Sequence, residues 1–234
     1  MKAYALTHVG LVREQNEDTI RFDAEKGLYI LADGMGGHQA GEVASALAAD
    51  TLLRELENAA PSYRALRAAI SAANTAIYQQ QQLHEDQAGM GTTLTVLWEA
   101  REHVFLGHVG DSRAYLYLNG QLRQISEDHS MVGEMLRAGA LTEEQARSHP
   151  YRNVITRAVG TEDSVRADVM KILKTPGEKW LLCSDGLSDM VEDQEIAAVL
   201  SQYPAQEAAQ RLIDLALAHG GRDNVSVLLL EVEA

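Results

Sequence analysis

The chain has one cysteine and four prolines among 234 residues. The single cysteine, Cys183, excludes an internal disulfide and is typical of a reducing compartment. The scarcity of proline and of Ser/Gly-rich linkers favours one domain over residues 1–234. The longest apolar run, near Val225–Leu230, is too short to span a membrane, and the N-terminus has no apolar stretch like that of a signal peptide. We therefore expect a cytoplasmic protein.

Positive charge is also in short supply. Twenty Lys and Arg residues stand against 34 Asp and Glu residues, which gives a formal net charge of −14. Nucleic acids and anionic membranes repel such a chain, so neither is an expected partner. Hydrophobic residues make up 46% of the sequence, which is enough for a sizeable core.

The most informative stretch is Leu28–Gly41, LYILADGMGGHQAG. An apolar run of buried-strand length predicts a strand that ends at Asp33, followed by a glycine-rich turn. A helix with one apolar face is predicted from about Gln39 to Leu56. A carboxylate at the end of a rigid strand, next to the carbonyl of Gly34, suits a hard cation that prefers oxygen ligands.

The middle of the chain is rich in strand signals. Thr92–Trp98, Val104–Val109 and Arg113–Leu118 read as strands, and Asn119-Gly120 predicts a hairpin into Gln121–Ile125. We expect these strands to form an antiparallel meander.

Helices are predicted on both sides of this β-rich region. Pro61 is expected to open one, Ser130 to cap another, and Thr142–Gln145 to form a capping box. Two more are predicted near the C-terminus, at about Asp193–Leu200 and Ala205–His219. Paired helices beside runs of strands favour an α+β fold with layers of antiparallel sheet covered by helices.

Four aspartates fall at predicted strand ends: Asp33, Asp111, Asp185 and Asp223. If they converge, their like charges raise one another's pKa, and two divalent cations would balance them. All-oxygen ligation is typical of Mg²⁺ or Mn²⁺, whereas zinc prefers His or Cys. The alternative is that each aspartate is an ordinary turn or cap residue.

Seven short motifs occur in a fixed order along the chain. They are Arg13–Asp18 (REQNED), Ala32–Gly37 (ADGMGG), Gly89–Thr93 (GMGTT), Gly107–Arg113 (GHVGDSR), Asp128–Ser130 (DHS), Ser184–Gly186 (SDG) and Asp223-Asn224. In this order the chain resembles the metal-dependent Ser/Thr protein phosphatases of the type 2C (PPM) family, and its compact length resembles the bacterial branch. The resemblance runs from Gly10 to Val232.

The resemblance implies an αββα sandwich, with two central antiparallel β-sheets flanked by helices, and a dinuclear Mg²⁺ or Mn²⁺ centre at one edge. It implies that Asp33 bridges two metals, that Gly34 offers its carbonyl, and that Asp185 and Asp223 hold the first metal. Glu17 and Asp18 would support the second metal, and Asp111 with Asp185 a weaker third one. Asn224 would orient its neighbour or a metal-bound water.

The implied activity is hydrolysis of phosphoserine and phosphothreonine by direct attack of a metal-bridging water, with Arg13 clamping the phosphate through its planar fork. No covalent phosphoenzyme is expected, so Ser112, Ser184 and Cys183 are not candidate nucleophiles. Cys183 is expected in the core. Two alternatives stay open: an inert pseudophosphatase that serves as a binding module, and a small-molecule phosphomonoesterase on the same fold.

The proton donor for the leaving group is the least defined part of the implied site. Many eukaryotic members of that family carry a histidine two residues after the aspartate that corresponds to Asp33. This chain has Met35 at that position. His38, His129, His149 or a metal-bound water could take this role, although His129 with Asp128 is expected to stabilise the helix start at Ser130.

Residues 139–157 match the flap of bacterial relatives, and Ser148–Arg157 is predicted to be irregular. In this segment His149, Arg152 and Arg157 could contact substrate; a solvated basic loop is the alternative. The expected partners are phosphorylated proteins and, functionally, an opposing Ser/Thr kinase. A monomer is expected.

Overall fold

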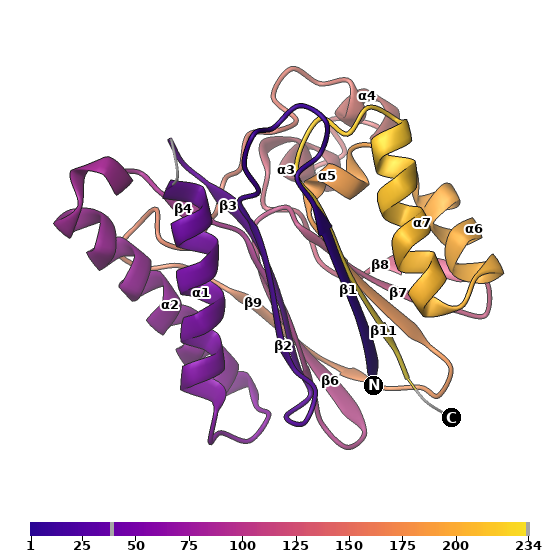
Figure 1. Cartoon of the computed structure of the whole chain (residues 1–234), viewed down its shortest axis with the longest axis horizontal. Helices are drawn as coiled ribbons and strands as arrows, with labels where there is room; N and C mark the ends of the chain where they lie inside the picture. The colour runs from indigo at the N-terminus through magenta and orange to yellow at the C-terminus, as the bar shows by residue number, and fades with distance from the viewer. Residues whose placement is uncertain (38–39, 233–234) are drawn as a thin grey trace.

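The computed structural model describes residues 1–37 and 40–232, and its strands form two antiparallel sheets (Figure 1). The strands are β1 Lys2–His8, β2 Asp18–Asp23, β3 Leu28–Met35, β4 Gly91–Thr92, β5 Leu94–Glu99, β6 His103–Val109, β7 Arg113–Leu118, β8 Gln121–Gln124, β9 Asp168–Leu173, β10 Lys179–Cys183 and β11 Val225–Glu231. One sheet has the order β1-β11-β10-β7-β8. The other has the order β2-β3-β5-β6-β9, and the short β4 pairs with β3.

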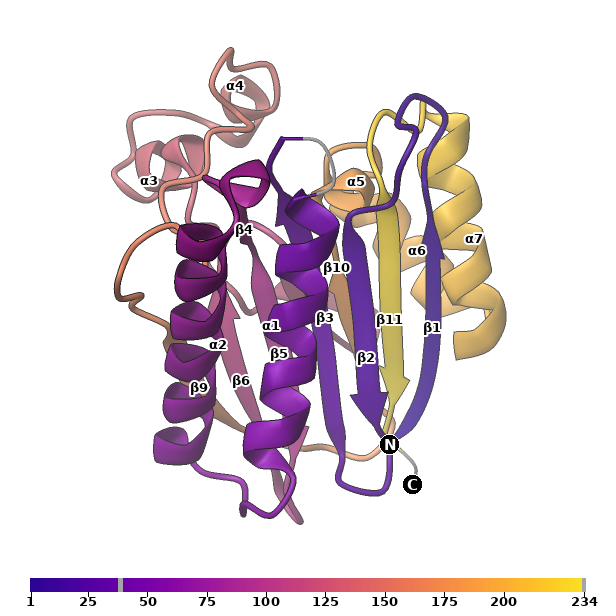
Figure 2. The same ribbon diagram turned by 60° about the vertical axis from the view of Figure 1, so that its left-hand side comes forward.

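The longer helices cover the outer face of each sheet, and α3 and α4 lie at one end of the sandwich (Figures 1 and 2). The helices are α1 Ala40–Leu56, α2 Tyr63–Leu83, the 3₁₀ turn η1 Glu85–Gln87, α3 Met131–Arg137, α4 Glu143–Arg147, α5 Asp185–Ser188, α6 Asp193–Gln202 and α7 Ala205–Ala218. Helices α1 and α2 pack on the sheet that contains β3, whereas α6 and α7 pack on the sheet that contains β11. The αββα sandwich implied by the family resemblance is confirmed. No helix in the described part of the chain is both long and apolar enough to cross a membrane.

The apolar run in β3 is continuous because both faces of this strand are buried. Leu28, Ile30 and Ala32 face α1 and α2, while Tyr29 and Leu31 face the second sheet. Side chains alternate between the faces of a strand, so a strand between two apolar layers reads as an unbroken hydrophobic run. Its burial holds Asp33 at a fixed place at the end of the sandwich.

The predicted meander is wrong at one step. Strands β5 and β6 pair in one sheet, but β7 lies in the other, so the chain crosses between the sheets at Gly110–Ser112. Gly110 has φ +108°, and a Cβ there would lie 2.6 Å from the side chain of Thr93. Only glycine accepts this crossing, and it places Asp111 between the sheets. The β7–β8 hairpin at Asn119-Gly120 is confirmed, with both residues at positive φ.

Most predicted boundaries agree with the structure to within a few residues. Ser130 caps α3 and the Thr142–Gln145 capping box starts α4, as predicted. Ser62, not Pro61, caps α2. Strand β3 continues past Asp33 to Met35 because β4 pairs with its last two residues. The one-turn helix α5 was not predicted.

Helix α1 approaches β3 so closely that Gly34 has no room for a side chain. A Cβ at Gly34 would lie 2.0 Å from the carbonyl oxygen of Gly41. We expect Gly34→Ala to lower the free energy of unfolding by about 3 kcal/mol, because backbone on both sides must move. Gly37→Ala is the matched control, since no described atom lies within 4 Å of a Cβ there. Urea denaturation measures both variants, and equal stability would contradict this packing argument.

Candidate metal centre

Two of the predicted ligands are cross-strand neighbours at one end of the sandwich. Asp18 on β2 pairs in register with Asp33 on β3. Asp18 is 8% exposed, and its Oδ2 accepts a hydrogen bond of 2.8 Å from Ser184 Oγ, which belongs to the other sheet's side of the site. The hydrogen bond from Ser184 therefore holds the Asp18 carboxylate in place and links the two sheets. Its buried hydroxyl thus positions a candidate ligand.

Asp185 and Asp223 come from adjacent strands of the second sheet. Asp185 follows β10 as the first residue of α5, and Asp223 precedes β11. The two segments touch through backbone, because a Cβ at Gly186 would lie 2.0 Å from the carbonyl oxygen of Asn224. This contact brings both carboxylates to the end of the sandwich at which Asp18 and Asp33 lie.

The resemblance implies that Asn224 orients its neighbour or a metal-bound water, and the backbone N–H of Asn224 donates to its neighbour, Asp223, at Oδ1 over 2.9 Å. The side chain of Asn224 makes further contacts. Its Oδ1 accepts the N–H of Glu17 at 2.8 Å, and its Nδ2 donates to the carbonyls of Val9 and Gln15 at 2.9 and 2.8 Å. The amide thus ties the loop between β1 and β2 to the start of β11. It positions Glu17, whose carboxylate packs against Gly41.

Arg13 lies at the rim of this cluster. Its side chain is 52% exposed, and Nη2 donates to Asp223 Oδ2 at 2.7 Å. It lines a cavity of about 770 Å³ with Glu14, Gln15, Glu17 and Gly36 among others. Arg13 therefore stands between the carboxylates and the open side of the site.

Asp111 and Asp185 line a second cavity, of about 320 Å³. Asp189, the residue that follows α5, lies four positions beyond Asp185 and lines the same cavity. Sequence reasoning missed Asp189, although the i, i+4 spacing in Ser184–Asp189 (SDGLSD) is a visible signal. Arg152 of the flap also lines this cavity, so it is the flap candidate that faces the carboxylates.

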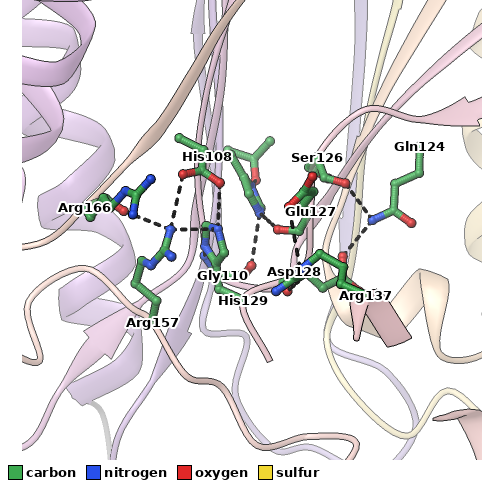
Figure 3. A network of polar contacts seen from close by, with 12 residues as sticks. His108, Gly110, Gln124, Ser126, Glu127, Asp128, His129, Arg137, Arg157 and Arg166 are labelled. Atoms are coloured by element: carbon green, nitrogen blue, oxygen red, sulfur yellow. Dashed lines mark hydrogen bonds and ion pairs between the residues drawn. The ribbon is translucent and has the colours of Figure 1, made fainter. Parts of the chain in front are cut away.

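The other candidates lie elsewhere. His149 is half-buried and its ring lies 5.7 Å from that of Tyr151. Arg157 is half-buried and binds Asp168 and the carbonyl of Arg166 (Figure 3). His38 lies outside the described residues. His129 does not stabilise the helix start with Asp128 as expected, because its ring bonds to Gly110 and Asp168.

Burial and mutual repulsion disfavour the charged forms of these carboxylates. Burial raises the pKa of Asp33 well above its ordinary value, and the charges of Asp18 and Asp185 add to the effect. Burial likewise raises the pKa of Asp185, with Asp111 as the strongest charged neighbour. Burial raises the pKa of Asp111 to about 7 and that of Asp18 to about 6. The cluster is therefore short of positive charge.

The donor set fits divalent cations that prefer oxygen. Asp18 Oδ1 and Asp111 Oδ1 are buried and have no hydrogen-bond partner in the described structure. Such orphaned carboxylate oxygens are costly unless a cation or water satisfies them. Among the described residues, no group of three or more Asp, Glu, His or Cys side chains is placed so that these side chains alone could hold one metal ion. Water and the Gly34 carbonyl would complete each shell, as Mg²⁺ and Mn²⁺ accept.

Comparison with known proteins agrees with this arrangement. A family model described as "Protein phosphatase 2C" matches residues 11–218. "Serine/threonine protein phosphatase PstP" of Mycobacterium tuberculosis is 44% identical over 225 residues, which cover 95% of this chain and 43% of that protein. This chain therefore spans less than half of that relative's length.

Two further matches extend over nearly the whole of both chains. "Serine/threonine phosphatase stp" of Listeria welshimeri is 39% identical over 99% of this chain and 96% of its own length. The catalytic domain of PstP, solved "in complex with 2 Manganese ions", superposes with a TM-score of 0.90 at 40% identity, covering 100% of this chain and 98% of that one. The fold and the acidic edge thus define the class of metal-dependent phosphatases. The chain belongs to the protein phosphatase 2C family.

The raised pKa values predict a stability that depends on both pH and metal. Asp111 and Asp18, with ordinary values of 3.8, bind protons more readily in the folded chain than in the unfolded one. By linkage, these groups make the chelator-treated protein less stable as the pH rises from about 4 to about 7. Cations bind the ionised carboxylates and oppose this loss. The increase in melting temperature that Mn²⁺ gives over EDTA should be larger at about pH 8 than at about pH 5.5. Equal increases at both pH values would contradict the electrostatic account.

Proposed function

We propose that this chain is a metal-dependent protein-serine/threonine phosphatase that hydrolyses phosphoserine and phosphothreonine without a covalent phosphoenzyme. The observation that carries the proposal is the convergence of Asp18, Asp33, Asp111 and Asp185 with orphaned carboxylate oxygens and raised pKa values. Residues 1–234 make a single catalytic domain, which is supported by the apolar core that the two sheets share.

The residues that would hold two cations, Mg²⁺ or Mn²⁺, are Asp33, the Gly34 carbonyl, Asp185 and Asp223, with Glu17 and Asp18 in support. Asp111 and Asp185 would hold a weaker third cation. When bound, such ions acidify water and neutralise the charge of a transferring phosphoryl group.

The chain's own residues supply positioning. Arg13 stands at the open rim, and its planar fork can hold two phosphate oxygens. Ser184 holds Asp18, and Asn224 holds the backbone of Glu17, so both carboxylates keep their orientation. Cys183 lies in the core, and burial raises its pKa to about 12, so it is no nucleophile.

The substrate class follows from the shape of the site. Two open cavities flank the carboxylates, one beside Arg13 and one beside the flap residue Arg152. An exposed phosphorylated segment can lie across such an edge. Flap residues 139–157 then contact substrate, and a Ser/Thr kinase supplies the phosphoprotein. The one cysteine and the acidic charge favour the cytoplasm, and a monomer suffices.

Two alternatives remain distinct in their chemistry. An inert binding module has no need to retain every ligand carboxylate, and this chain has them all. A small-molecule phosphomonoesterase would prefer free phosphometabolites over a phosphopeptide. Comparing turnover of both substrates, with and without chelator and with each metal restored, separates the three functions.

Replacing Asp33 by Asn should abolish activity without unfolding the protein. Metal-assisted charge stabilisation is worth several kcal/mol, so hydrolysis of an aryl phosphate with Mn²⁺ should fall by about 10³-fold or more. The raised pKa of Asp33 shows that its charge is unfavourable where it lies, so the melting temperature in EDTA should not fall. Asp50→Asn, on the exposed surface, is the control and should be fully active. Full activity of Asp33→Asn would point to another centre.

Replacing Arg13 by Lys tests the phosphate clamp. Lysine keeps the charge but not the fork, so KM for a phosphopeptide should rise by about tenfold with kcat nearly unchanged. The control is Arg21→Lys, a surface residue paired with Asp50. A drop in kcat at constant KM would mean that Arg13 acts in the transition state and is not a ground-state clamp.

A further inference from the structure

Two neighbouring imidazoles contact Gly110, the residue before Asp111 (Figure 3). His108 Nε2 lies 3.0 Å from the Gly110 carbonyl oxygen and 3.1 Å from that of Glu127. His129 Nδ1 accepts the N–H of Gly110 at 3.0 Å, and the backbone N–H of His129 donates to the Gly110 carbonyl at 2.7 Å. Both the backbone N–H and the carbonyl oxygen of Gly110 are therefore hydrogen-bonded.

The partners of His129 fix its tautomer. Because Nδ1 accepts a hydrogen bond from the Gly110 N–H, the ring proton lies on Nε2. This Nε2–H donates to Asp168 Oδ2 at 3.0 Å, and Arg157 Nη1 lies 2.9 Å from the same nitrogen. Arg157 holds Asp168 in turn, with Nη1 at 3.3 Å from Oδ1. The imidazole is thus held at both nitrogens, and it cannot rotate without breaking a bond to Gly110 or to Asp168.

Asp111 depends on this backbone contact for its direction. Its carboxylate is buried, and Oδ1 has no partner among the described residues. Gly110 is in a backbone conformation that only glycine adopts freely, so it has no side chain of its own to anchor it. The hydrogen bonds with the two histidines hold this turn on the side before Asp111, and Ser112 Oγ, 2.8 Å from Thr93 Oγ1, holds it on the side after Asp111.

We propose that His129 is the positioning residue for Asp111: by accepting the Gly110 N–H, it holds this carboxylate towards Asp185 as a ligand of the weaker third cation. The inference rests on the proposed function, because it gives Asp111 a cation to bind. The competing explanation is that His129 only stabilises the flap base, where its carbonyl accepts the N–H of Thr156. Side-chain substitution separates the two, since that bond uses backbone alone.

The test uses a matched pair of variants in the full chain. His129→Asn keeps an acceptor near the position of Nδ1, while His129→Gln places its amide near the position of Nε2 and faces Asp168. Calorimetric titration with Mn²⁺ counts the sites and their affinities, with Asp111→Asn as the reference in which the third site is removed. Supporting contacts of this kind change metal affinity by about 10–100-fold. We expect His129→Gln to weaken the third site by about tenfold and His129→Asn to stay within about threefold of the unchanged chain. The first two sites should be unchanged in both.

Three outcomes would overturn the inference: third-site affinity unchanged in His129→Gln, equal losses in both variants together with a lowered melting temperature in EDTA, or no third Mn²⁺ bound by the unchanged chain. The proposed function fails separately, if the unchanged chain shows no Mn²⁺-stimulated hydrolysis of a phosphopeptide. If the enzyme is active and His129→Gln does not change the affinity of the third site, the proposed function holds and His129 does not position Asp111.

Discussion

Repulsion among buried carboxylates is the constraint that organises this structure. Asp33, Asp185 and Asp111 lie at one end of the sandwich, and burial with the charge of neighbouring carboxylates raises the pKa of each. Each of these groups would be more stable in water. Asp33 stays in place because β3, the strand that carries it, is buried on both faces and cannot shift independently.

Close backbone approach is what makes this convergence possible. Gly34 lies against the carbonyl of Gly41, Gly186 against that of Asn224, and Gly10 against that of Asp223. A Cβ at any of these positions would lie about 2 Å from a carbonyl oxygen. Gly10 and Gly186 each join segments that are far apart in sequence, Gly34 joins β3 to α1, and each contact adjoins a candidate ligand. The glycines in the motifs therefore serve packing as much as turning.

Local patterns predicted the parts of the fold that local chemistry decides. The doubly buried strand β3, the Asn119-Gly120 hairpin and the cap at Ser130 are each determined by neighbouring residues. The sheet that a strand joins is not determined in this way. Strands β6 and β7 have similar patterns, yet they belong to different sheets because the chain crosses at Gly110.

In the candidate site, too, local sequence patterns predicted some features and not others. The aspartates were predictable because each stands at the end of an apolar strand within a recognisable motif. The bonds of His129 to Gly110 and Asp168, and of Asn224 to three backbone groups of the β1–β2 loop, join residues 19 to 215 positions apart. No local pattern encodes such pairs, so the role expected for His129 was wrong and the bonds of the Asn224 side chain were not predicted. These long-range polar contacts are the part of the site that only the folded chain reveals.

The hydrogen bonds of Arg113 explain why the carboxylates stay available for cations. This arginine follows Asp111 by two residues and lines the same cavity, so it could neutralise the cluster. Asp128 instead binds its guanidinium through Nε and Nη2 at 3.0 and 2.7 Å, and the remaining Nη1 donates to Tyr115 at 3.0 Å. After burial, Asp128 raises the pKa of Asp111 more than Arg113 lowers it. The positive charge nearest in sequence is thus engaged elsewhere, and the demand for positive charge is left to ions from solution.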